Sequence, residues 1–152
     1  MRLRVVAIGK DRKGLLAPAA ADYAARIARR LPFEVVIAGE AQGEDATARR
    51  AEASLLRRAL RPREAVVVLD ERGEELTSRE LAARMATAER SGGRDLAFVL
   101  GGPSGLDPAL RAEAAWALAL SRFTLPHQLA RLVLLEQLYR AVSLLRGEPY
   151  HK

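Results

Sequence analysis

The chain has 152 residues, 49% of them hydrophobic and 29% charged, a balance typical of one folded domain and not of a disordered protein. It has no cysteine, which excludes disulfides, thiolate zinc sites and cysteine nucleophiles. No apolar run reaches the roughly 18 residues of a membrane span, and the first residues do not form a signal peptide. We therefore expect a single domain over residues 1–152, located in the cytoplasm.

The formal net charge is +6, and 22 of the 25 basic residues are arginines. A guanidinium group binds phosphate oxygens in pairs and stacks on nucleobases, so this excess favours a polyanionic partner such as RNA. No basic amphipathic tail or lipidation motif points to a membrane instead.

The first half of the chain predicts two strands and two helices. Leu3–Ile8 is a valine-rich run, ended by Gly9, that predicts a strand, and apolar residues at helical spacing predict a helix over Pro18–Arg30. Phe33–Ala38 predicts the second strand. A polar loop then leads to an Arg- and Ala-rich helix over Thr47–Leu60.

The second half continues the alternation with buried strands. Ala65–Leu69 and Leu96–Leu100 are continuous apolar runs, typical of strands covered on both faces. Thr77 with Glu80 three residues later predicts a capping box that opens a helix to Arg90. Asp107 and Pro108 predict the start of another helix near Ala109.

The last two elements are a short strand over Trp116–Leu120 and a long helix over Pro126–Arg146, ended by Gly147. Strands and helices thus alternate from end to end. The pattern predicts an α/β fold with a mainly parallel sheet and helices on both faces.

Three loops follow predicted strands, where open parallel sheets bind their ligands. They are residues 69–73 (LDERG), 100–105 (LGGPSG) and 121–127 (SRFTLPH). The glycine-rich loop lacks the order of a Walker loop, and the chain has no GxGxxG motif. It is therefore either a plain turn or a place where the backbone approaches a flat ligand closely.

The two histidines do not indicate a metal site, because His127 and His151 lie far apart in the sequence without an HExxH motif or a carboxylate cluster. His127 is expected to shape its loop through local hydrogen bonds, or to act as a general base. A serine hydrolase is not supported, since there is no GxSxG motif.

The long last helix is apolar on more than one side, so it lies either at the centre of the domain or at an interface between two copies of the chain. We favour a homodimer. The tail that follows, residues 146–152, would fray if it only ended the chain. Its tyrosine and histidine also suit contact with a nucleobase.

Three segments together resemble one family. Residues 69–82 (LDERGEELTSRELA), 98–106 (FVLGGPSGL) and 121–152, with the motifs TxPHQ, EQxYRA and RGxxYHK, are similar to the RlmH family of SPOUT-class methyltransferases. Members of that family methylate a pseudouridine in bacterial 23S ribosomal RNA. The resemblance covers essentially the whole chain.

The resemblance implies a SPOUT-type fold whose C-terminal segment forms a trefoil knot, and loops of the knot that bind S-adenosylmethionine. It also implies a homodimer in which the tail of one subunit completes the site of the other. Carried over by position, the residues expected to bind the cofactor are Leu69, Gly101, Gly102, Gly105, Arg122, Phe123, Thr124, Leu125, Pro126 and His127.

The implied reaction transfers a methyl group to N3 of the pseudouridine, with no metal. Because a sulfonium methyl is already activated, the protein has to align the reactants and assist loss of the N3 proton. The residues expected to assist are Tyr150, His151 and Arg140. Surface arginines are expected to hold RNA phosphates, for example Arg2, Arg4, Arg12, Arg26 and Arg29.

Two other interpretations stay open at this point. One is a homodimer of the same fold that binds RNA or the ribosome without catalysis. Such a protein would either not bind S-adenosylmethionine or bind it and form no methylated product. The other is a flavodoxin-like enzyme acting on a small molecule, which would carry a flavin or bind phosphate at the glycine-rich loop.

Overall fold

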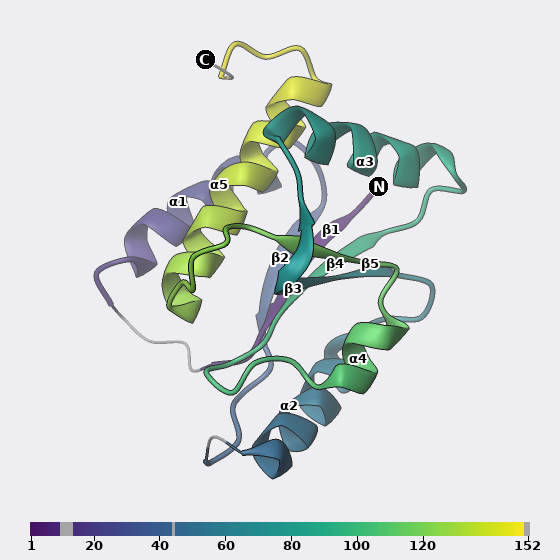
Figure 1. Ribbon diagram of the computed structural model, residues 1–152. Helices are drawn as coiled ribbons and strands as arrows, with labels where there is room; N and C mark the ends of the chain where they lie inside the picture. Colours follow the sequence, from purple (N-terminus) through teal and green to yellow (C-terminus); the bar gives the residue numbers. More distant parts are fainter. Residues whose placement is uncertain (10–13, 44, 151–152) are drawn as a thin grey trace.

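The computed structural model describes residues 1–9, 14–43 and 45–150 (Figure 1). Five strands and five helices alternate along it. The strands are β1 (Leu3–Ala7), β2 (Phe33–Ile37), β3 (Ala65–Glu75), β4 (Leu96–Leu100) and β5 (Trp116–Ala119). The helices are α1 (Ala17–Ala28), α2 (Ala46–Ala59), α3 (Ser78–Arg90), α4 (Pro108–Glu113) and α5 (His127–Leu145).

The strands form one parallel sheet in the order β2-β1-β4-β3-β5. The predicted α/β class and the parallel sheet are thus confirmed. β4 lies between β1 and β3, with Phe98 opposite Val5 on one side and Val67 on the other. All five carboxyl ends therefore point to the same edge of the sheet.

Helix starts agree with the predicted capping signals. Thr77 accepts a hydrogen bond from the Glu80 amide, and the Glu80 carboxylate accepts one from the Thr77 amide, which completes the capping box. Asp107 caps α4 by accepting from the Ala109 amide at 2.9 Å. Asp45 caps α2 in the same way, accepting from the amide of Ala48.

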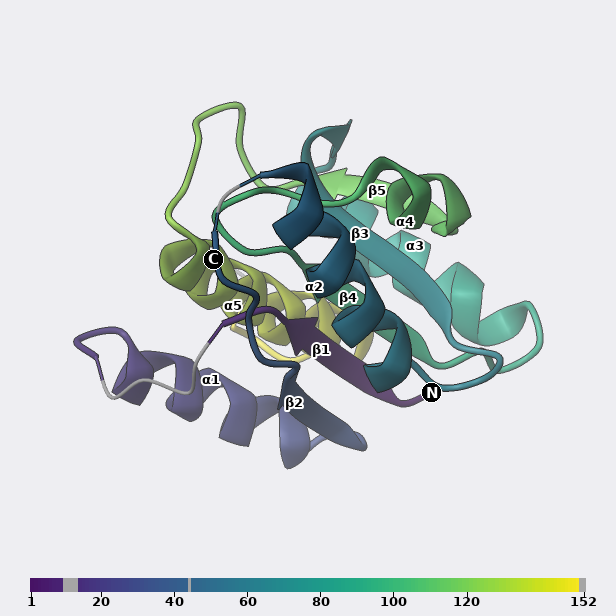
Figure 2. The same cartoon turned by 90° about the horizontal axis from the view of Figure 1, so that it is seen from below.

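Helices cover both faces of the sheet, as predicted (Figure 2). α1, α3 and α5 pack on one face through residues such as Ile27, Met85 and Leu138. α2 and α4 pack on the other face through Leu56 and Leu110. The core therefore has two layers separated by the sheet.

α5 lies between α1 and α3, and this position explains most of its apolar surface (Figure 1). Seven of its residues are buried: Leu134, Leu135, Leu138, Tyr139, Ala141, Val142 and Ser143. The helix thus occupies the centre of its layer. Leu129 and Val133 remain half-buried on its outer side, in line with Glu136 and Arg140.

Arg4 is not a surface residue, contrary to the expectation that it holds RNA. It is only 3% exposed, and its guanidinium group donates hydrogen bonds to the carboxylates of Glu34 and Glu64 and to the Ala59 carbonyl. These carboxylates come from distant parts of the chain and neutralise the charge of Arg4, which allows an arginine within a buried strand. Arg2 and Arg29 are exposed, whereas Arg12 lies outside the described residues.

None of the described helices is both long and apolar enough to cross a membrane. The trefoil knot implied by the resemblance stays a prediction.

Candidate functional site

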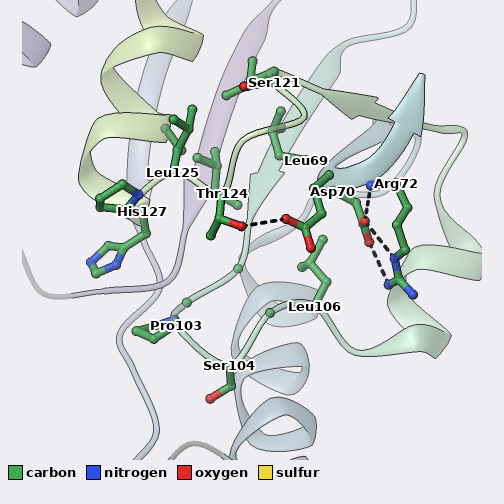
Figure 3. Close-up of a pocket in the computed structure, with 18 of the residues that line it drawn as sticks. Leu69, Asp70, Arg72, Pro103, Ser104, Leu106, Ser121, Thr124, Leu125 and His127 are labelled. Carbon is green, nitrogen blue, oxygen red and sulfur yellow. Dashed lines mark hydrogen bonds and ion pairs between the residues drawn. The ribbon is translucent and has the colours of Figure 1, made fainter. Parts of the chain in front are cut away.

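A cavity of about 780 Å³ lies at the carboxyl ends of three adjacent strands, β4, β3 and β5 (Figure 3). The three loops singled out in the sequence form most of its wall. The lining residues are Arg49, Leu69, Asp70, Glu71, Arg72, Leu100, Gly101, Gly102, Pro103, Ser104, Gly105, Leu106, Leu118, Leu120, Ser121, Phe123, Thr124, Leu125, Pro126, His127 and Ala130.

The first wall segment is an excursion within β3. Leu69 and Glu74 both pair with Leu118 of β5, so residues 70–73 leave the ladder and the strand resumes to Glu75. The predicted end of this strand at Leu69 is therefore too early. The excursion returns close to β5, because a Cβ at Gly73 would lie 2.7 Å from the backbone of Ala117.

The second wall segment is a tight turn of glycines after β4. The Gly105 amide donates a hydrogen bond to the Gly102 carbonyl at 3.0 Å, and Gly105 has a φ of +81°, which favours glycine. A Cβ at Gly101 would lie 3.0 Å from the Gly105 carbonyl oxygen. The glycines of this loop thus serve the shape of the turn as well as the cavity.

The third wall segment, residues 121–126, leads from β5 into α5. The Thr124 hydroxyl donates a hydrogen bond to Glu71 at 3.2 Å, which joins this loop to the β3 excursion (Figure 3). The Ser121 hydroxyl accepts from the Phe123 amide, while the Phe123 side chain is 82% exposed at the rim. α5 begins directly after Pro126, with His127 as its first residue.

Nine of the ten residues expected to bind the cofactor line this cavity: Leu69, Gly101, Gly102, Gly105, Phe123, Thr124, Leu125, Pro126 and His127. Arg122 does not. Its side chain is 86% exposed and lies 3.6 Å from the carboxylate of Glu75, outside the wall.

Sequence reasoning missed the charged residues of the cavity. The Asp70 carboxylate is 7% exposed and binds both Arg72 and Arg111, at 3.2 and 3.3 Å (Figure 3). Burial alone would raise the pKa of Asp70, but the hydrogen bonds from Arg72 and the charge of Arg111 outweigh it, so the pKa is lowered. The LDERG motif marks Asp70 and Arg72, whereas nothing local in the sequence indicates Arg111.

Tyr150 and Arg140 lie away from the cavity, in a second cluster between α1 and α5. The Tyr150 hydroxyl donates a hydrogen bond to Glu136, shares another with Tyr23, and Arg140 lies over its ring at 4.9 Å. Arg140 is 13 residues beyond His127 on one helix, which is about 20 Å along the axis. The structure therefore does not bring these two residues to the cavity of their own chain. His151 lies outside the described residues.

The cavity suits a nucleoside-sized ligand. Its volume falls in the range of small-molecule sites, and leucines line it together with glycine backbone and a few polar groups. The Ser104 hydroxyl is buried and has no hydrogen-bond partner in the part of the chain that is described. Among the described residues, no group of three potential metal ligands is present.

Comparisons with known proteins identify the family of the chain. The family described as "Predicted SPOUT methyltransferase" matches residues 1–151. The chain is 55% identical to the ribosomal RNA large subunit methyltransferase H of Anaeromyxobacter sp. (strain Fw109-5), with 100% of both chains covered. It is 40% identical to the protein of the same name from Geobacter sp. (strain M21), with 99% of each covered.

A solved structure, that of a probable methylase family protein from Haemophilus influenzae Rd KW20, shares the fold. It matches 99% of this chain and 70% of its own, with a TM-score of 0.54 and 14% identity. The family resemblance derived from the sequence motifs is thus confirmed. The chain belongs to the SPOUT methyltransferase family.

Proposed function

We propose that this protein transfers a methyl group from S-adenosylmethionine to N3 of a pseudouridine in 23S ribosomal RNA. The observation that carries the proposal is the convergence of three loops, after β3, β4 and β5, on one cavity of about 780 Å³. The full-length relatives named ribosomal RNA large subunit methyltransferase H support the rRNA substrate. The choice of N3 of pseudouridine rests on the family resemblance.

The residues of the cavity fit this cofactor. Leu69, Leu118 and Leu125 offer apolar surface to an adenine ring, and the glycine turn permits close approach of the backbone. The bond between Thr124 and Glu71 fixes the two outer loops relative to each other. Bound here, the cofactor supplies an electrophilic methyl group, and the protein's part is to align it with the nucleophile.

The remaining task is loss of the N3 proton, for which we propose Arg140 and His151, with Tyr150 stacking on the nucleobase or hydrogen-bonding it. A guanidinium group stabilises the imide anion that forms when the proton leaves. Tyr150 is a hydrogen-bond donor here, and burial, with its contacts to Tyr23 and Glu136, raises its pKa, so it does not serve as the base at neutral pH. This leaves His151 as the proposed proton acceptor.

Because Arg140 lies about 15 Å along α5 from Ala130, the cavity residue nearest to it on that helix, we propose a homodimer in which each tail serves the partner's cavity. The half-buried Leu129 and Val133 on the outer side of α5 support an apolar contact there. The exposed Phe123 at the cavity rim and the fully exposed Leu15, which follows Gly14 beside Gln128 of α5, offer further apolar surface. Light scattering is expected to give twice the monomer mass.

The direct test is a methyl-transfer assay with S-adenosylmethionine and, separately, free rRNA, large subunits and assembled ribosomes. Mass spectrometry of the nucleosides should find methylated pseudouridine in at least one of them. Cofactor binding by calorimetry without product on any substrate would instead indicate an RNA-binding protein that does not catalyse transfer. Removing residues 150–152 should abolish transfer and leave cofactor affinity nearly unchanged.

Mixed dimers test the shared site. One subunit carries Gly102→Val, which collides with Ile8 and Glu52 behind the cavity wall, and the other lacks residues 150–152. Each is expected to be inactive alone. Random mixing should restore about a quarter of wild-type activity, since half of the dimers are mixed and each has one intact site. No restoration, with dimer exchange verified, would contradict the sharing of sites.

A further inference from the structure

Glu52, in the middle of α2, is a buried carboxylic acid that the proposed reaction does not use. The residue is only 4% exposed, and its Oε2 atom is buried without a hydrogen-bond partner in the described part of the chain. Buried acids are normally paired, since an unsatisfied polar atom costs free energy. The position of this acid therefore needs an explanation.

The carboxyl group lies directly behind the cavity wall. A Cβ added to Gly102 would be 2.6 Å from Glu52 Oε2 and 2.9 Å from Ile8 Cγ2. Gly102 lines the cavity, whereas Glu52 does not. The acid thus occupies the space that a side chain at position 102 would need, and one glycine separates it from the cavity.

The surroundings of Glu52 do not hold it in the charged form. Burial, and secondly the charge of Glu40 in the segment after β2, raise its pKa. Ile8 after β1 and Gly102 after β4 lie next to the carboxyl group and carry no charge. The nearest cation along α2 that lines the cavity is Arg49, three residues before Glu52. The charge of this carboxyl group can therefore respond to the charge of a molecule in the cavity.

We propose that Glu52 makes the cavity selective for ligand charge, favouring the cationic methyl donor over the neutral product. This inference rests on the proposed function. S-adenosylmethionine and S-adenosylhomocysteine share their adenosine and amino-acid ends and differ at sulfur by one methyl group and one positive charge. A carboxylate behind the wall attracts the first and not the second, and a site with little water strengthens the difference.

The charge of the bound ligand changes with every methyl transfer. The bond between sulfur and the methyl carbon breaks, and sulfur keeps its electron pair. A carbon–nitrogen bond forms from the electron pair of the pseudouridine N3, and the N3 proton passes to the proton acceptor. The product is thus neutral at sulfur. Glu52 then retains the donor before transfer and no longer holds the product after it, which speeds exchange.

The test is calorimetry of both ligands with the dimeric protein at a series of pH values from about 5 to 9, above the ordinary pKa of a glutamate. The affinity ratio of donor to product should rise by about three- to tenfold with pH in the wild type, as Glu52 loses its proton. In Glu52→Gln the affinity ratio of donor to product should not rise with pH, and at high pH it should be lower than in the wild type. Glu113→Gln, at an exposed acid of α4, is the matched control and should behave like the wild type.

A second measurement needs no variant. At the pH values where the affinity ratio changes, binding of S-adenosylmethionine should release a fraction of a proton to buffers of different ionisation enthalpy, and binding of S-adenosylhomocysteine should not. Equal proton release for both ligands, or the same pH profile in wild type and Glu52→Gln, would overturn the role of Glu52 alone. Failure of the wild type to bind either ligand would overturn the proposed function, and the role of Glu52 with it.

Discussion

The hydroxyl group of Tyr150 lies 3.1 Å from Oε1 of Glu136 and donates a hydrogen bond to it. The ring also packs edge-on against Tyr139, with centroids 4.6 Å apart. These contacts fasten the last described residue of the chain to α5. The tail is thus anchored to α5 up to Tyr150.

Tyr150 should ionise later than an ordinary tyrosine. Its pKa is raised by burial, by its hydrogen bond with Tyr23 and by Glu136, so its stabilising contribution is complete below about pH 10, the value of the unfolded chain, and is lost as pH rises further. Tyr150→Phe should remove a late-ionising group from the tyrosinate absorbance titration. It should also lower the free energy of unfolding by about 0.5–1.5 kcal/mol.

Tyr23→Phe is the matched control, because it removes the contact with Tyr150 and leaves the bond from Tyr150 to Glu136. Its titration should keep a late-ionising group. If Tyr150→Phe instead removes a tyrosine that ionises near pH 10, the Tyr150 hydroxyl does not make these hydrogen bonds.

Asp70 should stabilise the cavity wall at neutral pH and not in acid. Its pKa is lowered, because the hydrogen bonds from Arg72 and the charge of Arg111 outweigh burial, so its contribution is present above about pH 4 and is lost as pH falls through the lowered value. Asp70→Asn should cost about 1–3 kcal/mol of unfolding free energy at pH 7. In urea melts the cost should shrink toward pH 3, and a cost independent of pH would contradict the ion pairs.

Gly73→Ala should distort the cavity by forcing the β3 excursion away from β5. The new Cβ would lie 2.7 Å from the carbonyl carbon and oxygen of Ala117, and backbone atoms cannot turn aside as a side chain can. We expect a loss of about 1–3 kcal/mol in unfolding free energy and weaker ligand binding. Gly14→Ala, where the nearest atom is 3.8 Å away, should change stability little. Equal effects of the two substitutions would exclude the collision.

Arg4→Ala should be among the most damaging substitutions of a charged residue, although the cavity is untouched. It removes the ion-pair partner of the Glu64 carboxylate, which is 2% exposed and keeps the hydrogen bond from the Arg61 amide. Breaking a buried pair in this way costs about 3–5 kcal/mol. Arg58→Ala in α2 removes an arginine that is exposed, and its thermal melt should stay close to that of the wild type. A mild effect of Arg4→Ala would show that water reaches Glu64.

The elements could be predicted from the sequence because their signals are local. Capping residues such as Thr77 and Asp107, and apolar runs such as Leu96–Leu100, fixed most boundaries within one or two residues. The β3 excursion was missed, since a polar stretch that leaves and rejoins a ladder is indistinguishable from a loop. Arg4 was assigned to the surface because its partners Glu34 and Glu64 are 30 and 60 residues away.

The candidate site could likewise be predicted where its signals are local and not where they depend on packing. The three loops that line the cavity were predicted by their position after the strands, a rule that parallel sheets obey generally. Their individual cofactor-binding residues came from the family resemblance. The charges of the cavity were not predicted, since Arg111 meets Asp70 only through the packing of α4 against the sheet. Glu52 carries no local signal either, because a glutamate on a helix is ordinarily exposed.

The strand order also determines when the site can form during synthesis. β1 is made first, yet one of its two neighbours is β4, and β3 pairs with nothing until β4 or β5 has emerged. The cavity further requires residues up to Ala130. A nascent chain therefore holds unpaired strand edges until β4 and β5 have left the ribosome, and the cavity is complete only after residues up to Ala130 have been made.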